Sequence, residues 1–258
     1  MSPPAGSSFQ AAEVVDLYLH RPPYAQEIYE RIQNFAPSRD ALLDLGCGEG
    51  KVARQMTKVF DRVFAVDPSA NMITLGKSLE NGDAENIEWL EATAENAALQ
   101  GLFDVVTFAS SIHWMEPVPL FTKLKKHLKE RHLLAIIRGD DPFEPAWQEE
   151  WLAFLTRWVP KVTGRALGSP QWEGARTQYL HHVDRIQEDE FISEPFRQPV
   201  EDFIQCQHSR DTFSLSKLGS QKQDFQRELE VILRPHADIQ GKLTFQVKTQ
   251  LTLATLKS

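Results

Sequence analysis

The amino-acid sequence has only two cysteines, no long apolar run and no excess of positive charge. Cys47 and Cys206 lie far apart in the 258 residues, so they cannot build a disulfide framework and predict a reducing, cytoplasmic setting. No apolar run approaches the roughly 18 residues that span a membrane. The net charge of −8 disfavours a nucleic-acid partner. We therefore expect neither a membrane nor a nucleic-acid partner, and the oligomeric state stays open.

The sequence also lacks the motifs of two common kinds of catalytic site. No cluster of cysteine and histidine has the spacing of metal ligands, and no G-x-S-x-G nucleophile motif occurs. We therefore expect no metal and no covalent intermediate. The composition, with 41% hydrophobic and 25% charged residues, is ordinary for a globular protein with a full core.

The most informative segment present is a short apolar stretch followed by a glycine-rich turn, A-L-L-D-L-G-C-G-E-G over residues 41–50. The pattern predicts a strand, a turn containing Gly46, Gly48 and Gly50, and then a helix. In α/β proteins this arrangement presents backbone N–H groups to a nucleotide. The turn is therefore a candidate cofactor site.

Two residues of this segment separate the possible cofactors. A dinucleotide fingerprint, G-x-G-x-x-G, requires a third glycine where Lys51 stands. Asp44 lies two residues before the first glycine, where a carboxylate would repel a pyrophosphate and suit a cofactor with a cationic amino group. The motif thus favours S-adenosylmethionine (SAM) over a nicotinamide dinucleotide.

The segment and three later ones resemble the class I SAM-dependent methyltransferases. A second strand ends at Asp67, 19 residues after Gly48; a third segment is 87–95 and a fourth is 103–114. Four motifs occur in the family's order over about residues 40–140. Within these methyltransferases, the His-Trp pair after the fourth strand and the tryptophan-rich region that follows are most similar to the trans-aconitate methyltransferase-like group.

The resemblance implies a set of cofactor-binding residues. It assigns Asp67 to the two ribose hydroxyls and the glycine turn to the methionine moiety. Adenine binding falls to Thr93 and Ala94, because this chain has A-T-A-E where many relatives have G-D-A-E. The remaining positions that the resemblance implies are Cys47, Pro68, Met72, Glu95, Ala109 and Ser110.

An upstream segment, Y-L-H-R-P-P-Y over residues 18–24, resembles the Y-x-x-x-R-P-x-Y segment of small-molecule methyltransferases, with one residue fewer between the first tyrosine and the arginine. The resemblance implies that Tyr18 and Arg21 fold over the methionine end of the cofactor, with Arg21 pairing with its carboxylate. The alternative is that Arg21 is a surface cation near the start of a helix.

The acceptor side is expected just after the fourth strand, because ligands of open α/β sheets bind at the carboxyl ends of strands. His113 is a candidate general base or a polar wall residue, and Trp114 is a candidate wall of the methyl channel or a core residue. The group that the chain resembles implies a small organic acceptor, with a carboxylic acid as one option. The cations that could orient a carboxylate are Arg138, Arg165 and Arg176.

The alternation of apolar and amphipathic segments predicts a Rossmann-like, doubly wound α/β sheet. The resemblance implies seven strands in the order 3-2-1-4-5-7-6, with an antiparallel last strand around 243–253 between strands five and six. We expect a strand around 199–207 and a helix around 221–233. Five further strands are expected at 41–47, 62–67, 87–92, 103–110 and 132–138.

We expect a single methyltransferase domain over residues 1–258, with 1–10 disordered and an aromatic-rich helical insert at 143–200 that caps the substrate site. Trp147, Trp151 and Trp158 recur with helical spacing in this insert. The stripe indicates either the buried face of a helix or rings that line an acceptor pocket, and both interpretations can hold together.

The leading hypothesis is a SAM-dependent methyltransferase that acts on a small molecule and releases S-adenosylhomocysteine (SAH). Methylation of RNA or protein is a second hypothesis, disfavoured by the acidic charge. A third hypothesis is a non-catalytic or repurposed protein that binds SAM without transferring its methyl group, since the glycine turn predicts binding and not turnover.

Overall fold

The computed structural model describes residues 12–170, 174 and 177–257, so the expected disorder of residues 1–10 concerns residues outside this set. The chain forms two compact units. The sheet unit comprises residues 25–139, 174–191 and 249–258. The helical unit comprises residues 1–24, 140–173 and 192–248. The insert expected at 143–200 matches this division only in part, because 174–191 belong to the sheet unit.

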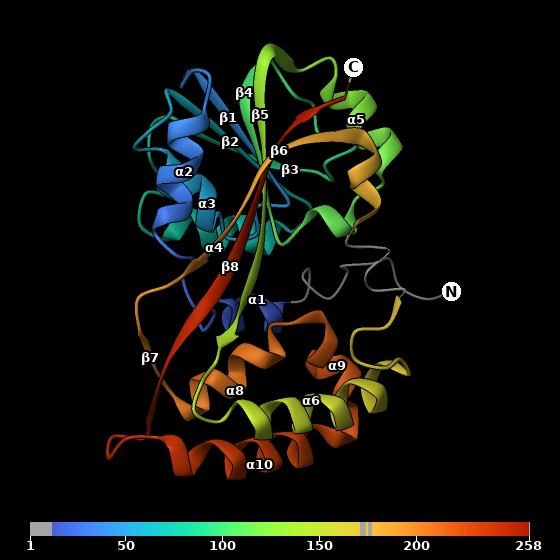
Figure 1. Ribbon diagram of the computed structural model, residues 1–258. Coiled ribbons are helices and arrows are strands. Elements are labelled where there is room, and N and C mark those ends of the chain that lie inside the picture. Colours follow the sequence, from blue (N-terminus) through green and yellow to red (C-terminus); the bar gives the residue numbers. More distant parts are fainter. Residues whose placement is uncertain (1–11, 171–173, 175–176, 258) are drawn as a thin grey trace. The chain divides into compact units, whose positions relative to one another are not determined.

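The sheet unit alternates strands and helices along most of its length (Figure 1). Its elements are α2 (Glu27–Phe35), β1 (Ala41–Leu45), α3 (Lys51–Met56), β2 (Arg62–Asp67), α4 (Ala70–Ser78), β3 (Ile87–Glu91), β4 (Phe103–Ala109), η2 (Ile112–Trp114), α5 (Pro117–Leu124), β5 (Leu128–Phe143), η3 (Gln178–His182), β6 (Val183–Ile192) and β8 (Lys242–Leu256). Of these, β5, β6 and β8 also contribute residues to the helical unit.

The strands follow the order β3-β2-β1-β4-β5-β8-β6, and the pairs β3–β2, β2–β1, β1–β4 and β4–β5 are parallel. Because the short strand β7 (Phe196–Pro199) pairs only with β8, β8 is the seventh strand along this path. The predicted order 3-2-1-4-5-7-6 is confirmed, including the position of the last strand between strands five and six. The fold is the Rossmann-like α/β sheet of the class I methyltransferases.

The prediction of a strand at 199–207 is wrong. The sixth strand is β6, and Val200–His208 forms the helix α8. Val200, Phe203 and Ile204 are buried, a 3.6-residue period, and Pro199 precedes the first turn. Strand β6 has few large apolar residues, and most of its side chains are exposed or half-buried, so no period-2 pattern marked it.

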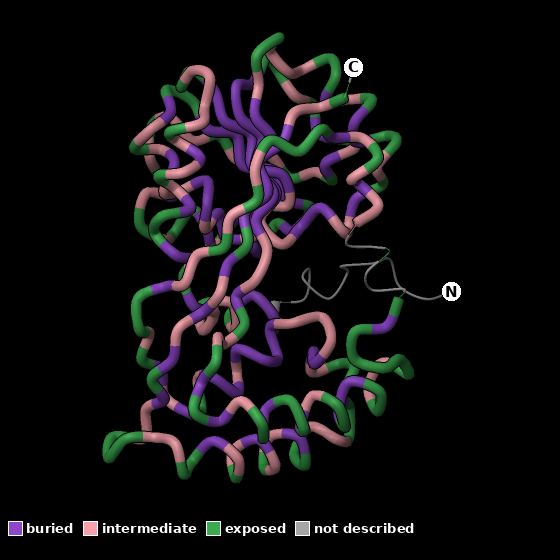
Figure 2. Tube along the Cα trace, in the orientation of Figure 1, coloured by how far each residue is buried: buried purple, intermediate pink, exposed green. Residues whose placement is uncertain are grey.

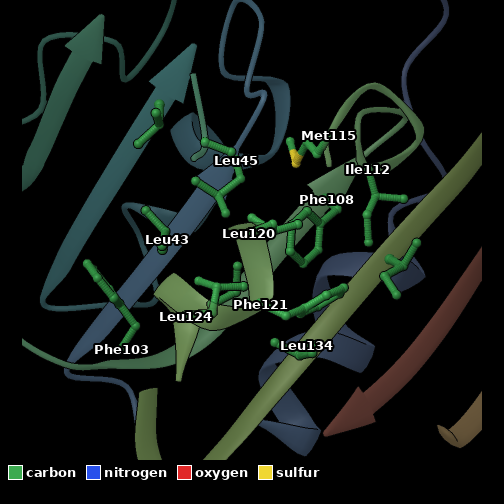
Figure 3. Close-up of a cluster of buried hydrophobic side chains, with 14 of the residues drawn as sticks. Leu43, Leu45, Phe103, Phe108, Ile112, Met115, Leu120, Phe121, Leu124 and Leu134 are labelled. Atoms are coloured by element: carbon green, nitrogen blue, oxygen red, sulfur yellow. The ribbon is translucent and has the colours of Figure 1, made fainter. Parts of the chain in front are cut away.

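The core of the sheet unit packs helix α5 against the parallel strands. Phe108 of β4 and Leu134 of β5 contact the α5 face, where Leu120 and Phe121 lie in the same cluster (Figure 3). Every residue of β1 is buried, and buried residues concentrate along the central strands (Figure 2). Helices α2, α3 and α4 lie on the other side of the sheet (Figure 1).

A buried carboxylate fixes the amino ends of the central strands. Asp104 of β4 is 1% exposed and accepts hydrogen bonds from the Ala41 amide (2.8 Å) and the Ser38 hydroxyl (2.5 Å). The Lys129 ammonium lies 2.7 Å from the same carboxylate. These contacts hold β1, β4 and β5 in register, so that their carboxyl ends meet at one edge.

The helical unit buries its aromatic residues in a core of its own. Its elements are α1 (Ala12–Tyr18), α6 (Gln148–Thr163), β7, α8, η4 (Asp211–Phe213), α9 (Leu215–Leu218), η5 (Gly219–Gln221), α10 (Lys222–Leu233) and η6 (Arg234–His236). Trp147, Trp151 and Trp158 are each at most 5% exposed and pack with Phe203 and Phe225 of α8 and α10. The stripe is therefore the buried face of α6, and these three rings have almost no surface left to line a pocket. The remaining tryptophan of the expected insert, Trp172, lies outside the described residues.

Candidate cofactor and acceptor site

The turn after β1 has the backbone geometry that its glycines predict. Gly46, Gly48 and Gly50 have φ values of 65°, 57° and 74°, a left-handed region that residues with a Cβ adopt only at a cost. A Cβ on Gly46 would lie 2.6 Å from the Cβ of Ser111, in the loop after β4. Ser111 also donates a hydrogen bond to the Leu45 carbonyl (2.6 Å). The turns after β1 and β4 are thus packed directly against each other.

The third glycine of the turn accommodates a tryptophan that the sequence interpretation did not assign to the site. A Cβ on Gly50 would lie 2.4 Å from the Trp89 ring of β3, and a Cβ on Gly76 of α4 would be equally close to it. The Trp89 indole N–H donates to the Gly82 carbonyl (2.9 Å). Trp89 therefore fixes the distance between the glycine turn and α4.

Asp44 lies beneath the glycine turn and not on its surface. The side chain is fully buried, and its carboxylate accepts hydrogen bonds from the Thr107 hydroxyl (2.7 Å) and the Ala53 amide (3.1 Å). Burial raises the pKa of Asp44 to about 7, and the neighbouring Glu49 and Asp67 carboxylates add to the increase. A direct contact between Asp44 and an amino group of the cofactor stays a prediction, whereas its support of the turn is visible.

Asp67, at the carboxyl end of β2, faces the glycine turn as predicted. One carboxylate oxygen accepts the Gly48 amide (2.8 Å) and the other accepts the Ser69 amide (2.9 Å). Burial raises the pKa of Asp67, while these two amides act in the opposite direction. Next to it, Pro68 is exposed and Met72 is only 1% exposed, so Met72 belongs to the interior of the sheet unit.

The predicted adenine segment follows β3. Thr93 is exposed and accepts a hydrogen bond from the Asn96 side chain (3.1 Å), and Ala94 is buried. The Glu95 carboxylate accepts the Glu116 amide (2.9 Å) in the loop after β4. Glu95 therefore ties the predicted adenine segment to the loop after β4, where the acceptor side is expected.

The acceptor loop begins at a strained residue. Ala109 ends β4, and Ser110, which is not a glycine, has a φ of 52°. Such outliers concentrate at functional sites. His113 and Trp114 follow in a single turn of 3₁₀-helix; both are half-buried, and their ring centroids are 4.5 Å apart.

Tyr18 and Arg21 contact each other in the helical unit. The Arg21 guanidinium lies over the Tyr18 ring, 4.2 Å from its centroid, and donates to the Ser209 hydroxyl (2.9 Å) and carbonyl (2.8 Å). It also lies 3.7 Å from the Asp140 carboxylate, which Arg210 approaches to 2.9 Å. Arg21 is thus an internal ion-pair partner and not a surface cation. Its predicted pairing with a cofactor carboxylate stays a prediction.

Tyr29 of α2 lies near the glycine turn, although the sequence predicted no role for it there. Burial raises the pKa of its phenol, and the nearby Asp44 and Glu49 carboxylates raise it further, which places the phenol beside the acids of the glycine turn. Tyr29 follows the buried Ile28 in α2, and its hydroxyl is the polar signal that the sequence offers on this otherwise apolar stretch.

The remaining predicted residues differ in environment. The Cys47 thiol is buried in the turn and contacts the Gly48 carbonyl at 3.5 Å; burial raises its pKa well above the ordinary value, so it stays protonated. Arg138 lines a pocket of the sheet unit, Arg165 is exposed, and Arg176 lies outside the described residues. The described parts of the chain contain no group of three or more metal-ligating side chains. Over the same residues, no helix is both long and apolar enough to cross a membrane.

Comparison with known proteins agrees with this geometry. Residues 43–136 match the family model of a methyltransferase domain. The methyltransferase pgmE of Aspergillus terreus is 32% identical over 85 residues, which cover 30% of this chain and 25% of pgmE. A ubiquinone biosynthesis O-methyltransferase of Bartonella bacilliformis is 28% identical over 129 residues, covering 47% of this chain and 50% of that protein. The matches therefore span at most half the length of these relatives.

Structural similarity to a solved protein extends beyond residues 43–136. A solved structure of a candidate type II methyltransferase from Anaeromyxobacter dehalogenans superposes with a TM-score of 0.65 at 19% identity. It covers 91% of this chain and 96% of that one. At this identity the likeness establishes the shared fold.

Proposed function

We propose that this chain, whose residues 43–136 match a methyltransferase domain, is a SAM-dependent methyltransferase that acts on a small organic acceptor. The observation that carries the proposal is the group of acids at the glycine turn. Asp67 accepts the amide of Gly48 in the turn, Asp44 lies beneath the turn and accepts the Ala53 amide, and Glu49 is a buried residue of the turn itself. This negative region attracts a sulfonium and an ammonium group and repels a pyrophosphate, so it supports SAM over a dinucleotide.

Asp67 supports the position of the ribose. Each of its oxygens accepts one backbone amide, and a carboxylate oxygen has two acceptor positions, so one remains on each oxygen. Two free acceptors on one fixed carboxylate suit a pair of adjacent hydroxyl groups. The Gly48 amide holds the carboxylate toward the turn, where the methionine end of SAM would lie.

The acceptor side is the loop from Ser110 to Trp114. Trp114 supplies an aromatic wall there. The tryptophans of α6 do not, because they are buried in the helical unit. SAM supplies a methyl group on a sulfonium: the acceptor's oxygen forms the new O–CH₃ bond as the S–CH₃ bond breaks, and the electron pair stays on sulfur in SAH. The chain's contribution is to align donor and acceptor and to exclude water, which in well-oriented reactions lowers the barrier by about 7–11 kcal/mol.

A carboxylic acid is the acceptor class that we favour. A carboxylate is already nucleophilic and transfers no proton, whereas a hydroxyl acceptor would require His113 as a general base. The identity of the acceptor thus predicts the effect of His113→Gln. Loss of a general base costs about 10²–10⁴ in rate, whereas loss of a polar wall residue costs far less.

Transfer of a tritium-labelled methyl group from SAM tests this function. The purified chain is incubated with a panel of small dicarboxylic and hydroxy acids and with the corresponding amides. We expect label in a base-labile ester of an acid, SAH release, no transfer to the amides, and a loss of less than tenfold in His113→Gln. Methyl transfer to RNA or protein and not to the panel would contradict the small-molecule assignment. Tight SAH binding without transfer to any acceptor would indicate a non-catalytic SAM-binding protein.

A further inference from the structure

A small pocket of the sheet unit lies beside the strands at the acceptor end of the sheet. It has a volume of about 180 Å³ and is lined by residues of three neighbouring strands. Arg138 belongs to β5, and the other lining residues are Glu188, Asp189, Glu190, Gln250, Leu251 and Thr252 of β6 and β8. Pockets for drug-sized ligands occupy about 300–1,000 Å³, so this one fits a smaller molecule.

Arg138 is the group in this pocket with unused hydrogen-bonding capacity. Its Nε is enclosed by the protein without a hydrogen-bond partner, so a ligand in the pocket would meet the two terminal nitrogens, and among the described residues no carboxylate lies within 4.0 Å of the guanidinium. A buried donor without an acceptor is costly, and a guanidinium offers a rigid fork of N–H groups. The fork matches the two oxygens of a carboxylate.

The acids of the pocket have partners of their own. Glu188 accepts from Arg185 (3.0 Å), and Asp189 lies 3.4 Å from Arg31. Glu190 accepts from the Gln250 amide (2.7 Å). The group that lacks a partner is therefore a donor and not an acceptor, which favours an anionic ligand over a cation.

The register of the sheet places Arg138 next to the acceptor loop. Ala109 of β4 pairs with Ile137 of β5, and the Ser110 amide donates to the Ile137 carbonyl (2.9 Å). The residue after Ile137 is Arg138, so its backbone lies across from the start of the Ser110–Trp114 loop. Neighbouring strands are about 4.8 Å apart. A ligand held by Arg138 therefore lies at the carboxyl edge of the sheet, on the side of β5 away from β4.

We propose that this pocket binds a small carboxylic acid, with Arg138 as the anchor of one carboxylate. Its assignment as the subsite that orients the methyl acceptor rests on the proposed function, whereas the binding itself does not. Glu190, which also lines the pocket, sets the specificity: its negative charge disfavours a second carboxylate on the ligand and favours a hydroxyl or ammonium group. The best ligand is then a hydroxy acid or an amino acid.

Binding of three probes, lactate, succinate and the neutral lactamide, tests the proposal by isothermal titration or ligand-observed NMR on the full chain. We expect saturable binding of lactate, weaker binding of succinate and none of lactamide. Arg138→Gln should weaken lactate binding at least tenfold, and Arg138→Lys, which keeps the charge but not the fork, should show an intermediate loss. Arg131→Gln, an exposed arginine of the same strand, is the matched control and should bind within twofold of the wild type.

Glu190→Gln is a second variant, which tests the proposal even if the Arg138 variants fail to fold. It keeps a hydrogen-bonding group and removes the charge. It should tighten succinate binding and weaken lactate binding. Equal binding of lactate and lactamide, an unchanged affinity in Arg138→Gln, or weaker succinate binding in Glu190→Gln would overturn the proposal, as would no binding of either acid to the wild type. SAH binding is measured in parallel: its absence would contradict the proposed function without affecting the result for the pocket.

Discussion

The buried carboxylate of Asp44 predicts an unusual dependence of stability on pH. The pKa of Asp44 is about 7 in the folded chain, against an ordinary value of 3.8. Between these values the folded state holds a proton that the unfolded state has lost, so the free energy of unfolding falls as the pH rises toward 7. At about 1.36 kcal/mol per pH unit, the fall between pH 5 and pH 8 is roughly 2.7 kcal/mol.

Asp44→Asn removes this titration. At pH 5 the wild-type carboxyl is itself protonated, and the asparagine amide likewise presents one acceptor oxygen to the Ala53 amide and one donor group to the Thr107 hydroxyl, so the two proteins should differ by no more than about 1 kcal/mol. The stability of the variant should change less with pH, so the variant should be the more stable of the two by roughly 2 kcal/mol at pH 8. Urea unfolding at half-unit pH intervals measures both curves. Parallel curves would refute the assignment of a buried, protonatable Asp44.

Three further predictions concern stability. Gly50→Ala should cost about 2–4 kcal/mol in urea unfolding, because its Cβ would lie 2.4 Å from the Trp89 ring at a φ of 74°, and Trp89→Leu should restore part of the loss. Asp104→Asn should lower the free energy of unfolding by about 1–3 kcal/mol at pH 7. Because Lys129 and the hydrogen bonds lower the pKa of Asp104, the difference in stability between wild type and variant should vanish as the pH falls below 4. Both ring nitrogens of the buried His208 form hydrogen bonds, and burial lowers the pKa of the imidazole. The stability of the wild type should therefore fall as the pH drops below about 6.5, and His208→Gln should reduce this dependence on pH.

The parallel strands and the glycine turn could be predicted because their local patterns are unambiguous. The turn at Gly46–Gly50 follows a fully buried strand, and the acid that ends β2 occurs at the expected distance. The left-handed φ values at the glycines then follow from their lack of a Cβ. These features are local in sequence, and tertiary contacts reinforce them.

The sequence was a weaker guide where an element depends on distant partners. Strand β6 is mostly polar and pairs with β8, which is distant in sequence, whereas the apolar residues of α8 favour a strand when only the local sequence is considered. The division into two units joins residues 192–248 to the N-terminal segment, which no local pattern indicates. The internal pairing of Arg21 with Asp140 and the contact of Trp89 with Gly50 also require the folded chain.

Isothermal titration with SAH is the measurement that tests the central claim most directly. The wild type should bind SAH with micromolar affinity. Asp67→Ala should lose roughly 1.5–3 kcal/mol, or about 10- to 150-fold, because hydrogen bonds to a charged group disappear. Asp61→Ala, at an exposed position just before β2, is the control and should bind like the wild type, and NADH should show no saturable binding. Equal SAH affinity in the wild type and Asp67→Ala, or tight binding of NADH, would contradict the account.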